Sequence, residues 1–154
     1  MFRLVYALVL VLLITTPSLG QQSLVGTYKM VSLVSDIGGT TIEPYGKAPR
    51  GYLVLTPTRL VAFYTGGNRK FGTSAADKAA LFDTMGGWSG TYRIEGSKMI
   101  IAIEASWIEH WNGKDQIRNW ELSGNRLTLK TNPQPYARDP SKTAVIQQVW
   151  EKVE

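Results

Sequence analysis

Hydrophobic and polar residues alternate along much of the chain, which is typical of strands with one buried face. The alternation is clearest between Trp88 and Leu129, where it predicts consecutive strands separated by short turns that contain glycine. Such short turns require antiparallel neighbours, because a parallel return needs a crossover of about a dozen residues. The four strands expected in this stretch are Trp88–Ile94, Met99–Trp107, Gln116–Leu122 and Leu127–Leu129.

The rest of the pattern predicts four more strands and one short helix. The helix is expected after Ser74, which can cap it together with Asp77, and the glycine pair 86–87 should end it. One face of this helix would hold Lys78, Leu81, Phe82 and Met85. The strands are expected after Tyr28 to about Ser35, and at Tyr52–Thr56, Leu60–Tyr64 and Ala144–Lys152, with a proline-rich loop from Asn132 to about Lys142 before the last one.

Eight antiparallel strands in about 130 residues either close into a barrel or stack as a sandwich. Closure is favoured, because sequential strands pair and the last can return to the first. The fold prediction is therefore an all-β, eight-stranded antiparallel up-and-down barrel, with the helix between the third and fourth strands as a plug or lid.

Two charged residues are expected to point into this barrel. Arg118 shares a strand face with Trp120 and Leu122, and Glu104 shares one with Ile100, Ala102 and Ser106. Glu104 and Arg118 would face each other across a hairpin, and their pairing would offset the cost of burying two charges. A structural ion pair and a functional pair both fit this pattern.

The first twenty residues form a separate segment. Arg3, an apolar run at Leu4–Ile14, and small residues before Gln21 fit a signal peptide cleaved after Gly20. A transmembrane anchor is the alternative, but it needs roughly 20 apolar residues. We therefore expect an exported protein, periplasmic or secreted, without stable membrane insertion, whose barrel domain spans residues 21–154.

Composition excludes several classes of site. The chain has no cysteine, so disulfides and thiolate chemistry are excluded. Its net charge of +5 is dispersed, which disfavours a nucleic-acid partner. His110, the single histidine, lies in a predicted hairpin without a second ligand in view, so neither a metal nor a cofactor is expected.

Several short motifs, in order, resemble the lipocalin-like domain family of small bacterial and fungal proteins, within the calycin superfamily. They are Leu24-Val25-Gly26-Thr27-Tyr28, Pro44-Tyr45-Gly46, Arg50-Gly51-Tyr52-Leu53, Trp88-Ser89-Gly90-Thr91-Tyr92, Glu104-Ala105-Ser106, Arg126-Leu127-Thr128-Leu129 and Trp150-Glu151. The resemblance implies a lipocalin-type barrel, with Tyr28 where the lipocalin Gly-x-Trp motif has tryptophan. Related sequences tend to carry paired histidines at the positions of Ile101 and Ala102.

The functional expectation is a lumen that binds a small, largely apolar molecule. The candidate ligand-binding residues are Glu104, Arg118, Ser106, Trp88, Tyr92, Trp120, Tyr52 and Tyr64. The alternative is an isomerase or cyclase acting on such a molecule, with Glu104 as acid–base and Arg118 or Tyr92 polarising a carbonyl. A third possibility is a packed barrel that acts through its surface, since aromatic residues in alternating strands commonly fill a core.

Overall fold

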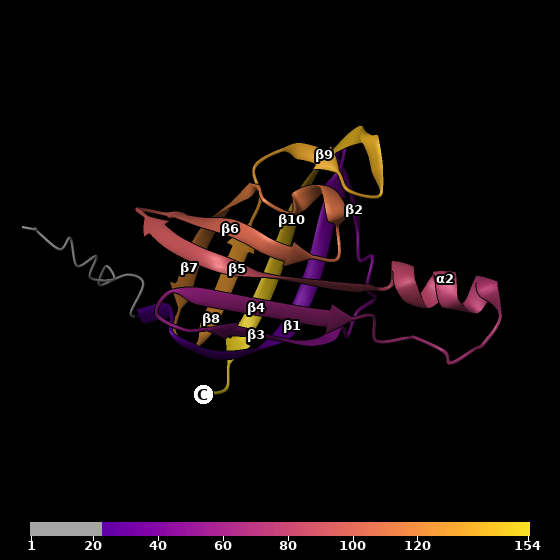
Figure 1. Ribbon diagram of the computed structural model, residues 1–154, viewed down its shortest axis with the longest axis horizontal. Coiled ribbons are helices and arrows are strands. Elements are labelled where there is room, and N and C mark those ends of the chain that lie inside the picture. Colours follow the sequence, from indigo (N-terminus) through magenta and orange to yellow (C-terminus); the bar gives the residue numbers. More distant parts are fainter. Residues whose placement is uncertain (1–22) are drawn as a thin grey trace, which may run out of the picture.

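In the computed structural model, which describes residues 23–154, ten strands form one antiparallel sheet (Figure 1). The strands are β1 (Gly26–Ile37), β2 (Thr40–Ile42), β3 (Arg50–Leu55), β4 (Arg59–Thr65), β5 (Met85–Glu95), β6 (Lys98–Ser106), β7 (Asp115–Ser123), β8 (Arg126–Lys130), β9 (Gln134–Tyr136) and β10 (Asp139–Lys152). The sheet closes because β1 pairs with β3 along one part of its length and with β10 along nearly all of it. The closed ring is β1-β3-β4-β5-β6-β7-β8-β10.

The eight-stranded antiparallel barrel expected from the sequence is therefore confirmed, with two short strands added. β2 folds back on the end of β1, and β9 pairs with the start of β10, so both extend the wall at one end of the barrel. Neither shows a usable pattern in the sequence. The three residues of β2 are all exposed, and β9 contains Pro135 within the segment predicted to be a loop.

The predicted helix is α2 (Ala75–Asp83), and it lies between the third and fourth strands of the ring. The Ser74 side chain accepts a hydrogen bond from the Asp77 backbone N–H, and the Asp77 carboxylate accepts one from the Ser74 backbone N–H, which completes the predicted capping box. The helix ends at Thr84, before the predicted glycine pair, which instead belongs to β5.

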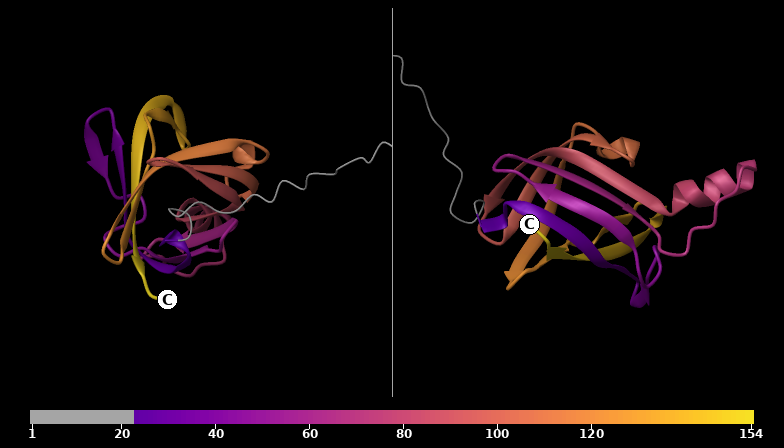
Figure 2. Two further views of the ribbon diagram at one scale, coloured as in Figure 1. Left: turned by 90° about the vertical axis from the view of Figure 1, so that its left-hand side faces the viewer. Right: turned by 90° about the horizontal axis from the view of Figure 1, so that it is seen from below.

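α2 does not fill the barrel, contrary to the expectation of a plug. It projects away from the strands in Figure 1 and in the right-hand view of Figure 2. None of its residues is buried. Leu81 and Phe82 are its only large apolar side chains, and two such side chains bury too little surface to hold a helix in a core.

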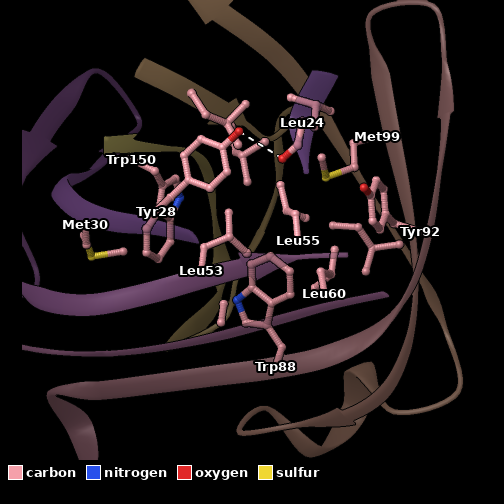
Figure 3. Close-up of a cluster of buried hydrophobic side chains, with 14 of the residues drawn as sticks. Leu24, Tyr28, Met30, Leu53, Leu55, Leu60, Trp88, Tyr92, Met99 and Trp150 are labelled. Carbon is pink, nitrogen blue, oxygen red and sulfur yellow. Dashed lines mark hydrogen bonds between the residues drawn. The ribbon is translucent and has the colours of Figure 1, made fainter. Parts of the chain in front are cut away.

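The end of the barrel opposite α2 is closed by packed side chains (Figure 3). Tyr28 is fully buried there, and its hydroxyl donates a hydrogen bond to the Leu24 carbonyl at 2.9 Å. Around these two residues the core holds Leu53, Leu55, Leu60, Tyr92, Met99 and Trp150. This closed end leaves the other end of the barrel as the position for a binding site.

Candidate functional site

A cavity of about 480 Å³ occupies the part of the barrel that faces α2. Its volume lies within the range of roughly 300–1,000 Å³ that is usual for small-molecule sites. Four connections contribute to its walls: the β2–β3 loop, the end of α2, the segment after β6 and the β9–β10 turn. Its aromatic lining residues are Tyr45, Tyr64, Phe82, Trp88, Trp107, Trp111 and Tyr136.

The ring of Tyr64 stands at the centre of the aromatic lining. It makes edge-to-face contacts with Tyr45, at a centroid distance of 5.1 Å, and with Trp150, at 6.2 Å. Glycines pair with Tyr64 on both neighbouring strands, Gly51 on β3 and Gly86 on β5. Burial raises the pKa of the Tyr64 hydroxyl well above its usual value, so the hydroxyl stays neutral at physiological pH.

Arg118 is the charged group that reaches into the cavity. β7 directs its side chain inward, where it is 5% exposed, and its guanidinium carbon lies 5.5 Å from the centroid of the Trp111 ring. Nη1 donates a hydrogen bond to the Ile117 carbonyl at 2.9 Å. None of the ion pairs formed within residues 23–154 includes Arg118. Burial lowers the pKa of Arg118 to about 10, so it remains a cation at neutral pH.

Ser35 adds an unsatisfied hydroxyl to the same cavity. Its side chain is 1% exposed, and its Oγ has no hydrogen-bond partner among the described residues. Thr131 and Gln148 also line the cavity, but both are engaged: the Thr131 Oγ1 accepts from the Ile146 N–H, and the Gln148 Oε1 accepts from the Trp150 indole at 3.4 Å.

Side chains from three separate segments meet at the mouth of the cavity. The Phe82 ring of α2 lies 3.6 Å, centroid to centroid, from the Trp107 ring beyond β6. The Arg138 guanidinium covers the Tyr45 ring at 5.1 Å and donates to the Asp83 carbonyl, which links the β9–β10 turn to the end of α2. His110 lies at the same rim in the short 3₁₀ turn η1 (Glu109–Trp111) and is exposed.

With this geometry, comparison with known proteins identifies the family. The sequence model of the lipocalin-like domain matches residues 25–153, which is most of the chain and the whole of the barrel. The chain belongs to the lipocalin-like domain family. The comparison with curated proteins and the comparison with solved structures each gave no match. Membership of the family accords with a barrel that takes a small hydrophobic molecule in its lumen.

Glu104 lies outside the lumen of this lipocalin-like domain, so the predicted Glu104–Arg118 pair is wrong. Its carboxylate meets Arg59 of β4 on the outer wall, with Oε2 2.6 Å from Nη1. The choice of inward face explains the error. Met99, Ile101 and Ile103 are the β6 residues of the core, so Glu104 follows Ile100 and Ala102 on the outer face. The β-bulge between Ile103 and Ala105 comes after this alternation and does not turn Glu104 inward. The acid–base group of the isomerase hypothesis is therefore absent from the cavity.

The other predicted ligand-binding residues of the lipocalin-like domain lie in three different parts of the barrel. Tyr64, Trp88 and Arg118 line the cavity. Tyr92 and Trp120 pack with the core outside it, since the Tyr92 hydroxyl donates to the Thr56 carbonyl at 2.8 Å and the Trp120 indole donates to the Gly96 carbonyl at 3.1 Å. Tyr52 and Ser106 do not line it.

The positions of Tyr52 and Ser106 correct two sequence-based assignments. Tyr52 is 54% exposed on the outer wall, where it pairs with Phe63. The Ser106 Oγ is not directed to a ligand, because it accepts a hydrogen bond from the Ile108 N–H at 3.0 Å and so shapes the turn after β6. The pattern placed Tyr52 inward because it begins a strand with too few preceding residues to fix the phase of the alternation.

Ser35, Trp107 and Trp111 are cavity residues that the sequence did not identify as such. A second bulge, between Met30 and Ser32, changes which face of β1 is inward and hides Ser35 from the alternation. Two tryptophans flanking a predicted hairpin turn were the available signal, because turns usually carry polar residues.

Two features are absent from residues 23–154. No group of three or more histidine, cysteine, aspartate and glutamate side chains in this part of the chain is placed to hold a metal ion. No helix within it is both long and apolar enough to cross a membrane. The predicted signal peptide at residues 1–20 lies outside the described residues.

Proposed function

We propose that this lipocalin-like domain is an exported binding protein that takes a small, largely apolar molecule into its lumen at the end facing α2. The observation that supports the proposal best is the 480 Å³ cavity, which three tryptophans and three tyrosines line. A barrel with a fully packed core would have no such space. Enclosed apolar walls with a few polar groups are the usual form of a small-molecule site.

The arrangement of the barrel supports access from this end. The closed end is filled by side chains such as Tyr28 and Trp150, which are fully buried. At the other end, exposed residues of α2, η1 and the β9–β10 turn surround the cavity mouth. A ligand can therefore reach the lumen past Phe82 and Trp107 without opening the strand ladder.

A neutral fluorescent probe tests this function. N-phenyl-1-naphthylamine should bind saturably with increased emission, and Ile146→Trp, which places a large ring in the cavity, should weaken its binding at least tenfold. Gln147→Trp is the matched control, because residue 147 is exposed on the other face of the same strand. Unsaturable probe binding, or equal binding by both variants, would overturn the proposal.

Export is tested separately. Expressed with its first twenty residues in a secreting host, the protein should be recovered with Gln21 at its N-terminus, because Ser18 and Gly20 satisfy the small-residue cleavage rule. Intact mass spectrometry measures this directly. A mass that includes Met1, found in the membrane fraction, would contradict export without affecting the binding proposal.

A further inference from the structure

We propose that the ligand carries one carboxylate group, and that this anion pairs with the Arg118 guanidinium inside the barrel. The inference rests on the proposed binding function and narrows its ligand to a monoanionic amphipathic molecule. Two observations carry it: a cation buried in the cavity without an ion-pair partner, and the unsatisfied hydroxyl of Ser35 in the same cavity.

The charge of the site is incompletely balanced by the protein. The guanidinium of Arg118 has five N–H donors. Within residues 23–154 it makes one hydrogen bond, to the Ile117 carbonyl. The Trp111 ring offers the guanidinium a cation–π contact, which compensates only a small part of the cost of burying a charge. A carboxylate matches the planar, forked donors of arginine and would form two charge-assisted hydrogen bonds with them.

Ser35 is placed to extend this anion site around the wall. Ser35 of β1 pairs with Ile146 of β10. The Ile146 N–H donates a hydrogen bond to the Thr131 Oγ1, and the Ile146 carbonyl accepts one from the Thr131 N–H. The β7–β8 register that joins Asn119 to Lys130 continues toward Arg118 and Thr131. Arg118 and Ser35 therefore belong to one band of inward residues across four neighbouring strands. The Ser35 hydroxyl has a proton to donate to an oxygen in this band.

The surroundings exclude other head groups. A cationic ligand would repel the Arg118 guanidinium, which is buried and therefore weakly screened by solvent. A dianionic phosphate would leave one negative charge uncompensated, because Arg118 is the only buried charged residue of residues 23–154. An alcohol would leave the Arg118 cation without a counter-ion. A single negative charge fits the site best.

The cavity volume limits the size of the molecule. At about 30 Å³ for each water-sized group, 480 Å³ holds on the order of 15 non-hydrogen atoms. Leu33, Trp88 and Leu129 supply apolar wall near the charged band. Decanoate, with a short unbranched apolar chain and one carboxylate, is a suitable probe of this chemistry.

The test compares ligands of equal chain length by isothermal titration calorimetry at pH 7.4, below the concentrations at which they form micelles. The probes are decanoate, decan-1-ol, decylamine and decyl phosphate. Decanoate should bind about 10- to 100-fold more tightly than decan-1-ol, which is the effect expected of hydrogen bonds to a charged group. Decylamine should bind more weakly than decan-1-ol, and decyl phosphate more weakly than decanoate.

Substitutions identify the residues that produce the preference for decanoate over decan-1-ol. Arg118→Gln should remove the advantage of decanoate over decan-1-ol, Arg118→Lys should keep part of it, and Ser35→Ala should reduce it about threefold to tenfold. Arg126→Gln is the charge-matched control, because Arg126 is exposed on β8 away from the cavity. Arg138→Gln tests the cation at the mouth and should leave the preference in place.

The outcomes separate this inference from the function on which it rests. Equal binding of decanoate and decan-1-ol, or a preference lost with Arg138→Gln and kept in Arg118→Gln, would overturn the carboxylate site while leaving a lumen for apolar molecules. Stronger binding of decyl phosphate than of decanoate would replace it with a phosphate site. Failure of the neutral probe and of all four ligands to bind would overturn both proposals. The ligand comparison uses the unaltered protein and remains decisive if an Arg118 variant does not fold.

Discussion

Gly86 lies directly against the ring of Tyr64. A Cβ atom at residue 86 would stand 2.7 Å from Cε2 and from Cζ of that ring, closer than nonbonded carbon atoms approach. Gly51, on the other neighbouring strand, is restricted by the strand itself, since its Cβ would lie 2.3 Å from the Phe63 carbonyl oxygen and 2.5 Å from the Tyr64 Cβ. The missing side chain at residue 86 is therefore what leaves room for the Tyr64 ring that lines the cavity.

Gly86→Ala should displace Tyr64 and damage both packing and binding. We expect a loss of about 1–3 kcal/mol in the free energy of unfolding, the usual cost of an overpacked methyl group. The displaced ring should also weaken binding of the neutral probe. Urea unfolding and probe titration measure the two effects.

Gly87→Ala is the control for this substitution, because a Cβ there would meet the Ala62 carbonyl oxygen at 3.2 Å and no ring closer than 3.4 Å. Its effect on probe binding should be smaller. A Gly86→Ala protein with unaltered stability and unaltered probe affinity would show that Tyr64 is not held in this way.

Arg59 and Glu104 form an ion pair whose side chains are 58% and 47% exposed. Solvent screens such pairs, so a double-mutant cycle with Arg59→Gln and Glu104→Gln should give a coupling energy of about 0–1 kcal/mol. Neither substitution should change ligand binding, because both residues lie on the outer wall. A coupling of several kcal/mol, or a loss of binding in Glu104→Gln, would return Glu104 to a role in the site.

The contrast between the barrel and Glu104 shows what the sequence can predict. The alternation of polar and apolar residues with short turns is a local signal, and it was sufficient for the eight strands of the ring. The capping box at Ser74 and Asp77 is equally local and was predicted correctly. The direction of an individual side chain depends on an unbroken count of two along the strand.

Bulges break this count, and the sequence does not mark them. The bulge of β1, between Met30 and Ser32, hid Ser35 in this way. Glu104 was placed wrongly for another reason: the apolar run from Met99 to Ala102 fits either phase, and the structure has Met99 and Ile101 inward. The cavity rim was also beyond sequence reasoning, because Trp107 and Trp111 lie in a connection that tertiary contacts position.

Arg118→Met should stabilise the ligand-free protein. Burial lowers the pKa of Arg118 to about 10, well below the value of a free arginine, and the difference corresponds to a cost on the order of 3 kcal/mol for keeping the cation in the fold. An apolar side chain of similar length avoids this cost, so we expect the free energy of unfolding to rise by about 1–3 kcal/mol. Urea unfolding of protein freed of bound ligand measures it.

Arg118→Lys is the control, because lysine keeps a charge at this position and should give no such gain. A clear loss of stability in Arg118→Met would indicate that Arg118 stabilises the barrel and is not a cation reserved for a ligand.

Buried tyrosines should make the protein sensitive to alkali. Burial raises the pKa of Tyr92 to about 12 and also raises those of Tyr28 and Tyr64 above 10. Above pH 10 the unfolded chain therefore releases phenolic protons that the folded chain retains. The stabilisation is complete below pH 10 and is lost as the pH rises from 10 through about 12. Arg118 affects stability in the opposite direction over this pH range, because its pKa is lower in the folded chain than in the unfolded chain. The three tyrosines outnumber this one group.

Tyr92→Phe tests the alkaline effect at a single residue. At pH 8 the variant should lose about 1 kcal/mol, because the hydrogen bond to the Thr56 carbonyl is missing. Between pH 10 and 12 its stability should fall less steeply than that of the unaltered protein, by up to about 1.4 kcal/mol per pH unit. Urea unfolding at half-unit intervals of pH measures both quantities. Tyr52→Phe, at an exposed ring on the outer wall, is the control and should leave the slope unchanged. Parallel curves of unfolding free energy against pH for Tyr92→Phe and the unaltered protein would show that the Tyr92 phenol titrates alike in the folded and unfolded chains. The burial of Tyr92 would then not contribute to the loss of stability in alkali.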